Sequence, residues 1–158
     1  MSDLSQTIAD KVVSAINVKS DYSNSYSPTA VRKFLPNRVV ANVEDSSSLT
    51  VQVSPLQLVA GIVDGAEVRE DHKMLVMVRD KIANGDNSDD YNETQLSNLL
   101  NLCKEIRLQI ISWCDVETNG LLFLNPYEQA ALYDEEDMQT GQFLSATEFT
   151  FRDFLTIG

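Results

Sequence analysis

Residues 67–79 have the sequence Glu-Val-Arg-Glu-Asp-His-Lys-Met-Leu-Val-Met-Val-Arg. The first half of this segment is polar, and the second half is almost continuously apolar. A short, continuous apolar run is typical of a strand that is buried on both faces of a sheet. We therefore expect one long strand, in which an exposed polar stem continues into a buried central part.

The polar stem has two interpretations. A strand that projects from the body of a protein can serve as an arm that meets a neighbouring molecule, because its edge can pair with another chain. The same pattern also fits a hairpin end that only faces water. On the first interpretation, the stem supplies the candidate interface residues Arg69, Glu70, Asp71, His72 and Lys73.

Further strands are expected on both sides of this segment. Residues 30–35 form a short β-prone run between two prolines, which indicate a sheet edge or a bulge because proline has no N–H to donate. Residues 49–53 alternate between apolar and polar side chains, and we expect Pro55 to end this strand. Residues 121–124 form a short apolar strand that should end at Asn125-Pro126.

The last expected strand covers residues 142–153. Its alternation places Phe143, Phe149 and Phe151 on one face, together with a serine and a threonine. Aromatic side chains that follow a strand alternation are typical of core or interface packing. We therefore expect the phenylalanine face of this strand to pack in the core or in an interface.

Two helices are expected, at residues 4–17 and 92–113, where apolar residues recur at helical spacing. Cys103 and Cys114 fall on the apolar face of the second helix. Eleven residues at 1.5 Å each place them about 16 Å apart, too far for a disulfide. We therefore expect two reduced, buried cysteines, as in an intracellular protein.

The size of the chain fits one domain. It has 158 residues, of which 43% are hydrophobic and 23% charged, as in an ordinary globular protein. No linker or internal repeat divides it, and no apolar stretch approaches the roughly 18 residues of a membrane span. The N-terminus lacks the features of a signal peptide. The sequence predicts a single α+β domain, residues 1–158, in a soluble protein made in the cytoplasm.

The charge balance restricts the possible partners. Asp and Glu number 24 against 12 Lys and Arg, so the formal net charge is −12. A surface that binds nucleic acid or an anionic membrane needs clustered Lys and Arg, and here the basic residues are scattered. The bulk surface is therefore a poor match for nucleic acid or for a membrane, whereas it can keep a subunit in solution until a partner arrives.

The sequence offers no residue that we expect to be catalytic, cofactor-binding or metal-binding. His72 is the only histidine, and we expect it on the surface. The cysteine spacing does not fit a zinc site. Gly61 and Gly65 lack the following Lys-Ser/Thr that a phosphate-binding loop requires.

Two acidic patterns in the sequence resemble cation sites. The loop 84–90 does not fit an EF-hand, which needs alternating ligands, a central glycine and a final glutamate. It is expected to be a solvated turn, and its acidic residues Asp86, Asp89 and Asp90 are candidate interface residues. Asp64 with Asp71-His72-Lys73 matches the acid and Asp-x-Lys pattern of metal-dependent nucleases, but the acidic surface disfavours a DNA substrate.

The order of the segments carries a family resemblance over nearly the whole chain. An N-terminal helix precedes Tyr26-Ser27-Pro28-Thr29-Ala30-Val31-Arg32-Lys33-Phe34-Leu35-Pro36, which has the pattern aromatic-x₅-Arg-x-aromatic-x-Pro. The strand Leu49–Pro55, the long strand to Arg79, a helix, Asn125-Pro126-Tyr127 and a closing strand follow. This series resembles the tail terminator and tail-completion proteins of long-tailed bacteriophages and prophages.

The resemblance implies a mixed, mainly antiparallel sheet with two main helices packed on one face. It implies a virion subunit of the tail or neck, assembled in the host cytoplasm. Such subunits form a ring, commonly a homohexamer, that caps the tail tube, ends its polymerisation and offers a docking surface to the head. The partners would be further copies of the chain, the tail tube protein and the neck proteins, with DNA only as passing cargo.

Three other functions remain open at the level of sequence. A head–tail connector or adaptor of the neck would have a similar ring role. A metal-dependent nuclease or other small hydrolase would need the acidic pattern around Asp71 to hold a metal ion. A monomeric regulatory domain would need no assembly surface at all.

Overall fold

The computed structural model describes residues 4–34, 49–82, 93–114, 122–131 and 141–156. These residues form α1 (Leu4–Val18), a short 3-10 turn η1 (Ser23–Ser25), β1 (Ala30–Arg32), β2 (Thr50–Asp64), β3 (Glu67–Lys81), α2 (Glu93–Trp113), β4 (Leu122–Ala131) and β5 (Gln142–Thr156). The expected helices at 4–17 and 92–113 and the expected long strand from residue 67 are confirmed.

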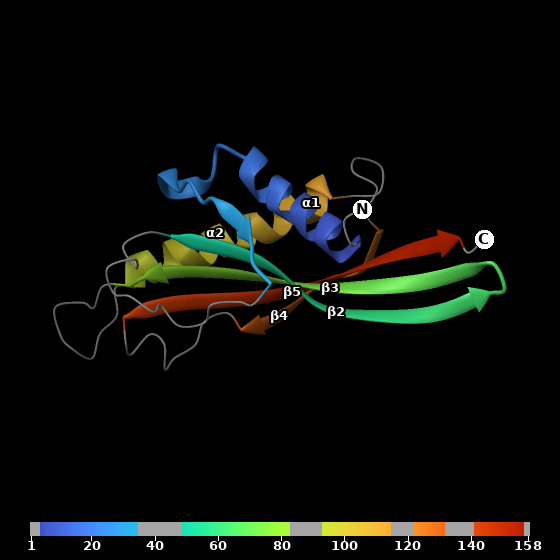
Figure 1. Ribbon diagram of the computed structural model, residues 1–158. Helices are drawn as coiled ribbons and strands as arrows, with labels where there is room; N and C mark the ends of the chain where they lie inside the picture. The colour runs from blue at the N-terminus through green and yellow to red at the C-terminus, as the bar shows by residue number, and fades with distance from the viewer. Residues whose placement is uncertain (1–3, 35–48, 83–92, 115–121, 132–140, 157–158) are drawn as a thin grey trace.

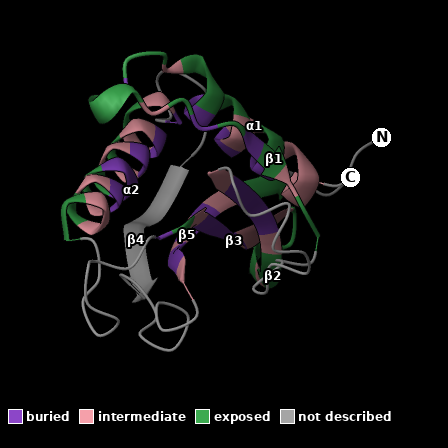
Figure 2. Cartoon of the chain, turned by 90° about the vertical axis from the view of Figure 1, so that its left-hand side faces the viewer, coloured by how far each residue is buried: buried purple, intermediate pink, exposed green. Residues whose placement is uncertain are grey.

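The strands form one five-stranded sheet in the order β1-β2-β3-β5-β4. The short β1 runs parallel to β2, and all other neighbours are antiparallel. Both α1 and α2 lie on the same side of the sheet, with their buried residues turned towards it (Figure 2). The predicted α+β class, with a mixed and mainly antiparallel sheet under two helices, is confirmed.

The main core lies between the helices and the sheet. Strand alternation places Met74, Val76 and Val78 of β3 on the helix side, where they join Phe143, Phe149 and Phe151 of β5 in one buried cluster. The apolar stripes of the two helices close this cluster from above with Ile8, Val12, Ile16, Leu99, Ile106 and Ile110. Each such side chain stabilises the fold by about 1.5–3 kcal/mol when it is fully buried.

The other face of the sheet carries a smaller cluster. Leu75 and Met77 of β3 and Leu144 and Ala146 of β5 are buried together there. This second cluster explains the continuous apolar run in β3, because successive side chains of a strand enter opposite layers. The expectation of a strand buried on both faces is confirmed. The stem that leads into it was expected to be exposed, but residues 67–73 are half-buried or buried because β2 and β5 flank them.

The strand ends predicted at two prolines are wrong. β2 continues through Pro55 to Asp64, with a register shift between Pro55 and Gln57. Among the described strands, β1 accompanies β2 only as far as Val53. Pro55 therefore has no described strand on its outer side, where its missing N–H would otherwise remove a ladder bond. β4 likewise continues through Asn125-Pro126 to Ala131 as the outermost strand, with register shifts on both sides of Asn125.

Both cysteines are free and buried, as expected. Cys103 lies within α2, and Cys114 follows its last residue, donating its backbone N–H to the carbonyl of Ile110 at 2.9 Å. Burial raises the pKa of the Cys103 thiol to about 11 and that of the Cys114 thiol to about 12. Both cysteines are therefore poor nucleophiles near neutral pH.

Candidate assembly surface

Three strands continue beyond the helices and form a projecting arm (Figure 1). We define the arm as residues 56–64 of β2, residues 67–73 of β3 and residues 150–156 of β5, which pair with one another in antiparallel register. β4 joins β5 only up to Arg152, so β5 from Asp153 onwards has no described neighbour on its outer side. The predicted polar stem is therefore the middle strand of a three-stranded arm.

The register assigns each arm residue to one of two faces. His72, in the middle strand, pairs with Leu58 and Phe151, and these residues share the helix-side face, because Phe151 lies in the core beneath the helices. Ile62, Val68 and Leu155 form another row on that face. The opposite face, which we call the outer face, carries Val59, Arg69, Asp71, Arg152 and Phe154.

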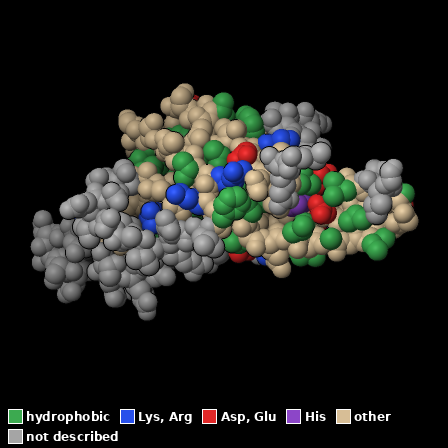
Figure 3. Space-filling model, viewed as in Figure 1, with side chains coloured by type: hydrophobic (Ala, Val, Ile, Leu, Met, Phe, Trp, Pro, Cys, Tyr) green, Lys and Arg blue, Asp and Glu red, His purple; other side chains and the backbone are tan. Residues whose placement is uncertain are grey.

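Large apolar side chains are exposed on both faces of the arm. On the helix-side face, Ile62 is 82% exposed and Leu155 is 39% exposed, and on the outer face Phe154 is 45% exposed. Leu56, Leu58, Val59 and Val63 of β2 are exposed as well. In the space-filling view, hydrophobic side chains recur along the arm, at the right of the molecule (Figure 3). Such a concentration is typical of a surface that meets another molecule.

The predicted interface residues of the stem do not form a single patch. Strand alternation places Arg69, Asp71 and Lys73 on the outer face and Glu70 and His72 on the helix-side face. The expectation of a surface histidine is wrong, because His72 is fully buried. Asp86, Asp89 and Asp90, the other predicted interface residues, lie outside the described residues.

The buried histidine connects α1 to the arm. Its Nδ1 lies 2.6 Å from Oγ of Ser5 in the first turn of α1, and its Nε2 lies 3.2 Å from Oε1 of Glu70. A serine, a histidine and a carboxylate in line are the elements of a catalytic triad, but the triad histidine must pass a proton to the leaving group and therefore has to face the substrate. The His72 ring has no exposed surface, so this chain of contacts holds the helix on the strand.

The outer face carries an ion-pair network. The guanidinium of Arg152 donates two hydrogen bonds to Asp71, from Nε to Oδ1 at 2.7 Å and from Nη2 to Oδ2 at 3.1 Å. These hydrogen bonds are the main reason why the pKa of Asp71 is lowered, and they also raise the pKa of Arg152. Nε of Arg69 lies 3.8 Å from Oδ2 of the same carboxylate. Two arginines therefore share one aspartate, and this part of the face is basic.

A glycine makes room for one of these arginines. Gly61 pairs with Arg69 across the hairpin, and a Cβ atom on Gly61 would lie 3.0 Å from Nη2 of Arg69. The guanidinium therefore rests against the bare backbone of β2 and keeps a side-chain exposure of 39%. Its charge remains accessible to a partner.

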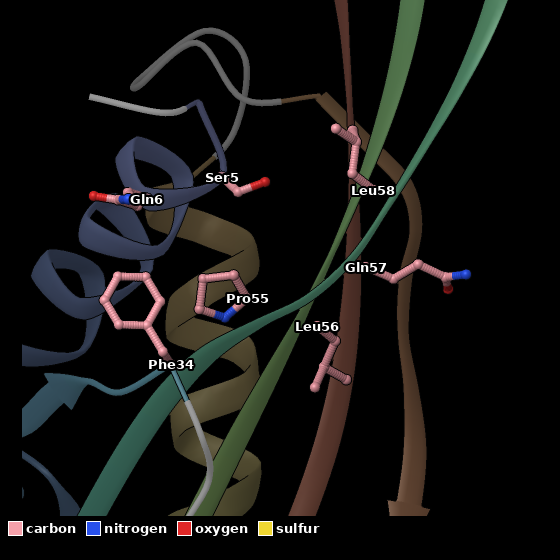
Figure 4. A pocket seen from close by; sticks show the side chains of 7 residues that line it. All are labelled: Ser5, Gln6, Phe34, Pro55, Leu56, Gln57 and Leu58. Carbon is pink, nitrogen blue, oxygen red and sulfur yellow. The ribbon is translucent and has the colours of Figure 1, made fainter. Parts of the chain in front are cut away.

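A shallow pocket of about 220 Å³ lies at the base of the arm. Figure 4 shows that Ser5 and Gln6 of α1, Phe34 after β1, and residues 55–58 of β2 line it. None of these lining residues is ionisable, and Phe34, Leu56 and Leu58 are exposed apolar side chains. The pocket therefore suits an apolar side chain of a partner and extends the helix-side face of the arm through Leu58.

The structure does not assemble the nuclease-like pattern. Asp64 lies at the hairpin end, where its Oδ1 accepts a hydrogen bond from the backbone of Ala66, and it pairs with Glu67. Asp71 lies four residues further along β3, about 13 Å away at the rise of a strand, with its carboxylate held by Arg152. Among the described residues, no group of three or more His, Cys, Asp or Glu side chains is placed to hold a metal ion.

Comparisons with known proteins add no relative. No protein-family model matches the sequence, and no curated protein matches it. Within the described part of the chain, neither α1 nor α2 is long and apolar enough to cross a membrane.

The sequence prediction was based on the polar stem and missed the exposed apolar residues that β2 contributes to the arm. Leu58, Val59 and Ile62 belong to a segment that sequence analysis left without an element, between the strand expected to end at Pro55 and the strand that begins at Glu67. Two β-rich segments joined by Asp64-Gly65-Ala66 are the pattern of a hairpin. Recognising it would have revealed the second strand of the arm.

Proposed function

We propose that this protein is a structural subunit of a long-tailed bacteriophage that assembles into a ring at the end of the tail tube. The ring ends polymerisation of the tube and offers a docking surface to the head. The arm supports this proposal, because it exposes large apolar side chains on both faces while the rest of the domain has a conventional core. Its action is binding, with no chemical step.

The arm's exposed side chains favour association. Burying one such side chain in an interface is worth about 1.5–3 kcal/mol before the costs of association are subtracted. In addition, no described strand pairs with the outer edge of β2 beyond Ser54. A long apolar edge of this kind is an aggregation hazard unless another chain covers it.

A ring accounts for the two-sided character of the arm. A dimer with two-fold symmetry uses the same patch on both copies, so it would cover one face and leave the other in water. Head-to-tail contacts use two different patches on each copy and close into a ring where the rotation allows it. The resemblance to tail terminators implies that the ring commonly has six copies and that its partner is the tail tube.

The first test measures the oligomeric state and the effect on tube growth. Native mass spectrometry and negative-stain microscopy of the purified chain, alone and with a phage tail tube protein, should show a closed ring bound at one tube end. Tubes grown in its presence should be shorter than tubes grown alone. A chain that stays monomeric at all concentrations and leaves tube length unchanged would contradict the proposal. Binding to portal or connector subunits in place of the tube would indicate a neck adaptor.

A further inference from the structure

The two faces of the arm differ in charge as well as in position. On the helix-side face, Glu70 and Asp153 pair directly across β3 and β5, so two carboxylates are neighbours there. On the outer face, Arg69 and Arg152 share the single carboxylate of Asp71. Lys73 lies on the same outer face and its Nζ is 3.7 Å from Oε2 of Glu148, whereas Glu67 adds a carboxylate to that face at the tip. The middle of the arm is therefore acidic on the helix-side face and carries an excess of cations on the outer face.

The apolar side chains lie beside these charges on each face. Ile62 and Leu155 lie one row from the Glu70–Asp153 pair, towards the tip of the arm. Phe154 pairs directly with Arg69 on the outer face. Each face thus combines exposed apolar area with a local excess of charge, which is negative at Glu70 and Asp153 and positive around Arg69 and Arg152. This is the composition of a surface with a complementary partner.

We propose that the helix-side face of one arm packs on the outer face of the arm of a second copy, head to tail around the ring. Sheets that pack face to face lie about 10 Å apart, a distance that brings their facing side chains together. Phe154 of one copy then contacts Ile62 and Leu155 of the next, and Arg69 meets the carboxylates of Glu70 and Asp153. This contact rests on the proposed ring and specifies which surfaces form it.

The charges disfavour the symmetric alternatives. If two helix-side faces met, Glu70 and Asp153 would lie against the same carboxylates of the other copy. If two outer faces met, Arg69 and Arg152 would face each other. Like charges that are brought together in an interface cost several kcal/mol, and a chain with a net charge of −12 already repels its copies. The head-to-tail contact places the arginines of the outer face against the two carboxylates of the helix-side face.

Cysteine cross-linking tests the contact directly. Two variants, Ile62→Cys and Phe154→Cys, are mixed in equal amounts and treated with a short bis-maleimide, and the covalent dimers are counted by denaturing gel. The native Cys103 and Cys114 are buried, with raised thiol pKa values, so they should react slowly. The mixture should give several-fold more covalent dimer than either variant alone.

The matched control replaces an exposed apolar residue away from the arm. Val18 ends α1 and is 59% exposed, so Val18→Cys mixed with Phe154→Cys should give only the background of random collisions. Native mass spectrometry of the same samples reports whether a ring is present. A ring whose mixed sample gives no more dimer than the control overturns the arm contact and leaves the ring proposal standing. Absence of any ring overturns both.

Substitutions that reverse charges test independently whether the contact between copies is head to tail. Arg69→Glu and Asp153→Lys should each prevent ring formation alone, because each places like charges in every contact. An equal mixture of the two variants should restore rings, since alternating copies pair the new charges with each other and the native charges with each other. Stronger association of Asp153→Lys alone would show that two helix-side faces meet, which contradicts the head-to-tail contact.

Discussion

At the scale of single residues, one asparagine fixes the edge of the sheet. Asn17 lies near the end of α1, and its side-chain amide forms the same pair of hydrogen bonds, one donated and one accepted, that the backbone of a neighbouring strand would form. Its Nδ2 donates to the carbonyl of Ala30 at 3.1 Å, and its Oδ1 accepts from the N–H of Ala30 at 2.8 Å. Both backbone groups of the first β1 residue are thereby satisfied on the side away from β2.

Replacing this asparagine should destabilise the domain. Asn17→Ala leaves two backbone groups at a partly buried position without these partners, and each such loss costs about 1–3 kcal/mol. We expect the free energy of unfolding, measured by urea denaturation, to fall by about 2–6 kcal/mol, the sum of the two losses. Asn101→Ala on the exposed side of α2 is the control and should change stability by less than about 0.5 kcal/mol. Equal effects of the two substitutions would contradict this role.

The Asp71–Arg152 pair should make stability depend on pH in the acid range. The hydrogen bonds from Arg152 lower the pKa of Asp71 from its ordinary value of 3.8. Because the folded-state pKa lies below the unfolded-state value, Asp71 stabilises the fold above about pH 4, and this contribution is lost as pH falls through the folded-state pKa. The difference in the free energy of unfolding between the native chain and the Asp71→Asn variant should therefore become smaller below about pH 4.

The partner substitution provides the check on this assignment. Arg152→Gln removes the same hydrogen bonds, so it should abolish the same part of the acid dependence. A double-mutant cycle measured by denaturation at pH 7 and at pH 3 should show a coupling that is smaller at the lower pH. A coupling that is the same at both pH values would mean that another group carries the acid dependence.

At the scale of elements, the sequence predicted what depends on local pattern. The helices at residues 4–17 and 92–113 and the phenylalanine face of β5 follow from periodicity, and the structure confirms them. The end of β2 could not be predicted in this way, because a proline breaks a ladder only where its missing N–H faces another strand. Whether β1 reaches Pro55 is a tertiary property.

The arm could also be predicted only in part, because some of its features follow from local sequence pattern and others depend on tertiary contacts. The stem 67–73 was interpreted either as an arm strand or as a hairpin end that faces water, because its polar residues precede a continuous apolar run. The burial of His72 depends on Ser5, which lies 67 residues away in sequence and meets it only after α1 packs on the sheet. The division of the stem into an acidic and a basic face required the pairing partners Arg152 and Asp153, which the register supplies.

The arm should contribute to assembly more than to folding. Ile62 is 82% exposed in the single chain, so Ile62→Asp should change the free energy of unfolding by less than about 0.5 kcal/mol. The same substitution places a charge in the proposed contact and should abolish rings in native mass spectrometry. Val18→Asp, at an exposed residue of α1, is the matched control and should leave ring formation intact. Rings that survive Ile62→Asp would exclude the arm tip from the interface.

At the scale of the whole molecule, two electrostatic effects act against each other. Each copy carries a net charge of −12, so copies repel one another over long distances. The arm contact pairs Arg69 with acidic residues at short range. Salt weakens interactions between exposed charges, most strongly those separated by more than the Debye length, which falls from about 30 Å at 0.01 M to about 8 Å at 0.15 M.

Moderate salt should therefore promote ring formation. Between 0.01 and 0.15 M NaCl, screening removes most of the repulsion between whole subunits, whereas charge pairs inside a packed interface are screened much less. The concentration at which half of the chains are in rings, measured by mass photometry or analytical ultracentrifugation, should fall over this range. MgCl₂ at matched ionic strength separates screening from specific cation binding, because screening alone predicts the same shift for both salts. A half-assembly concentration that rises steadily with NaCl would mean that exposed charge pairs, and not the apolar faces of the arm, dominate the contact.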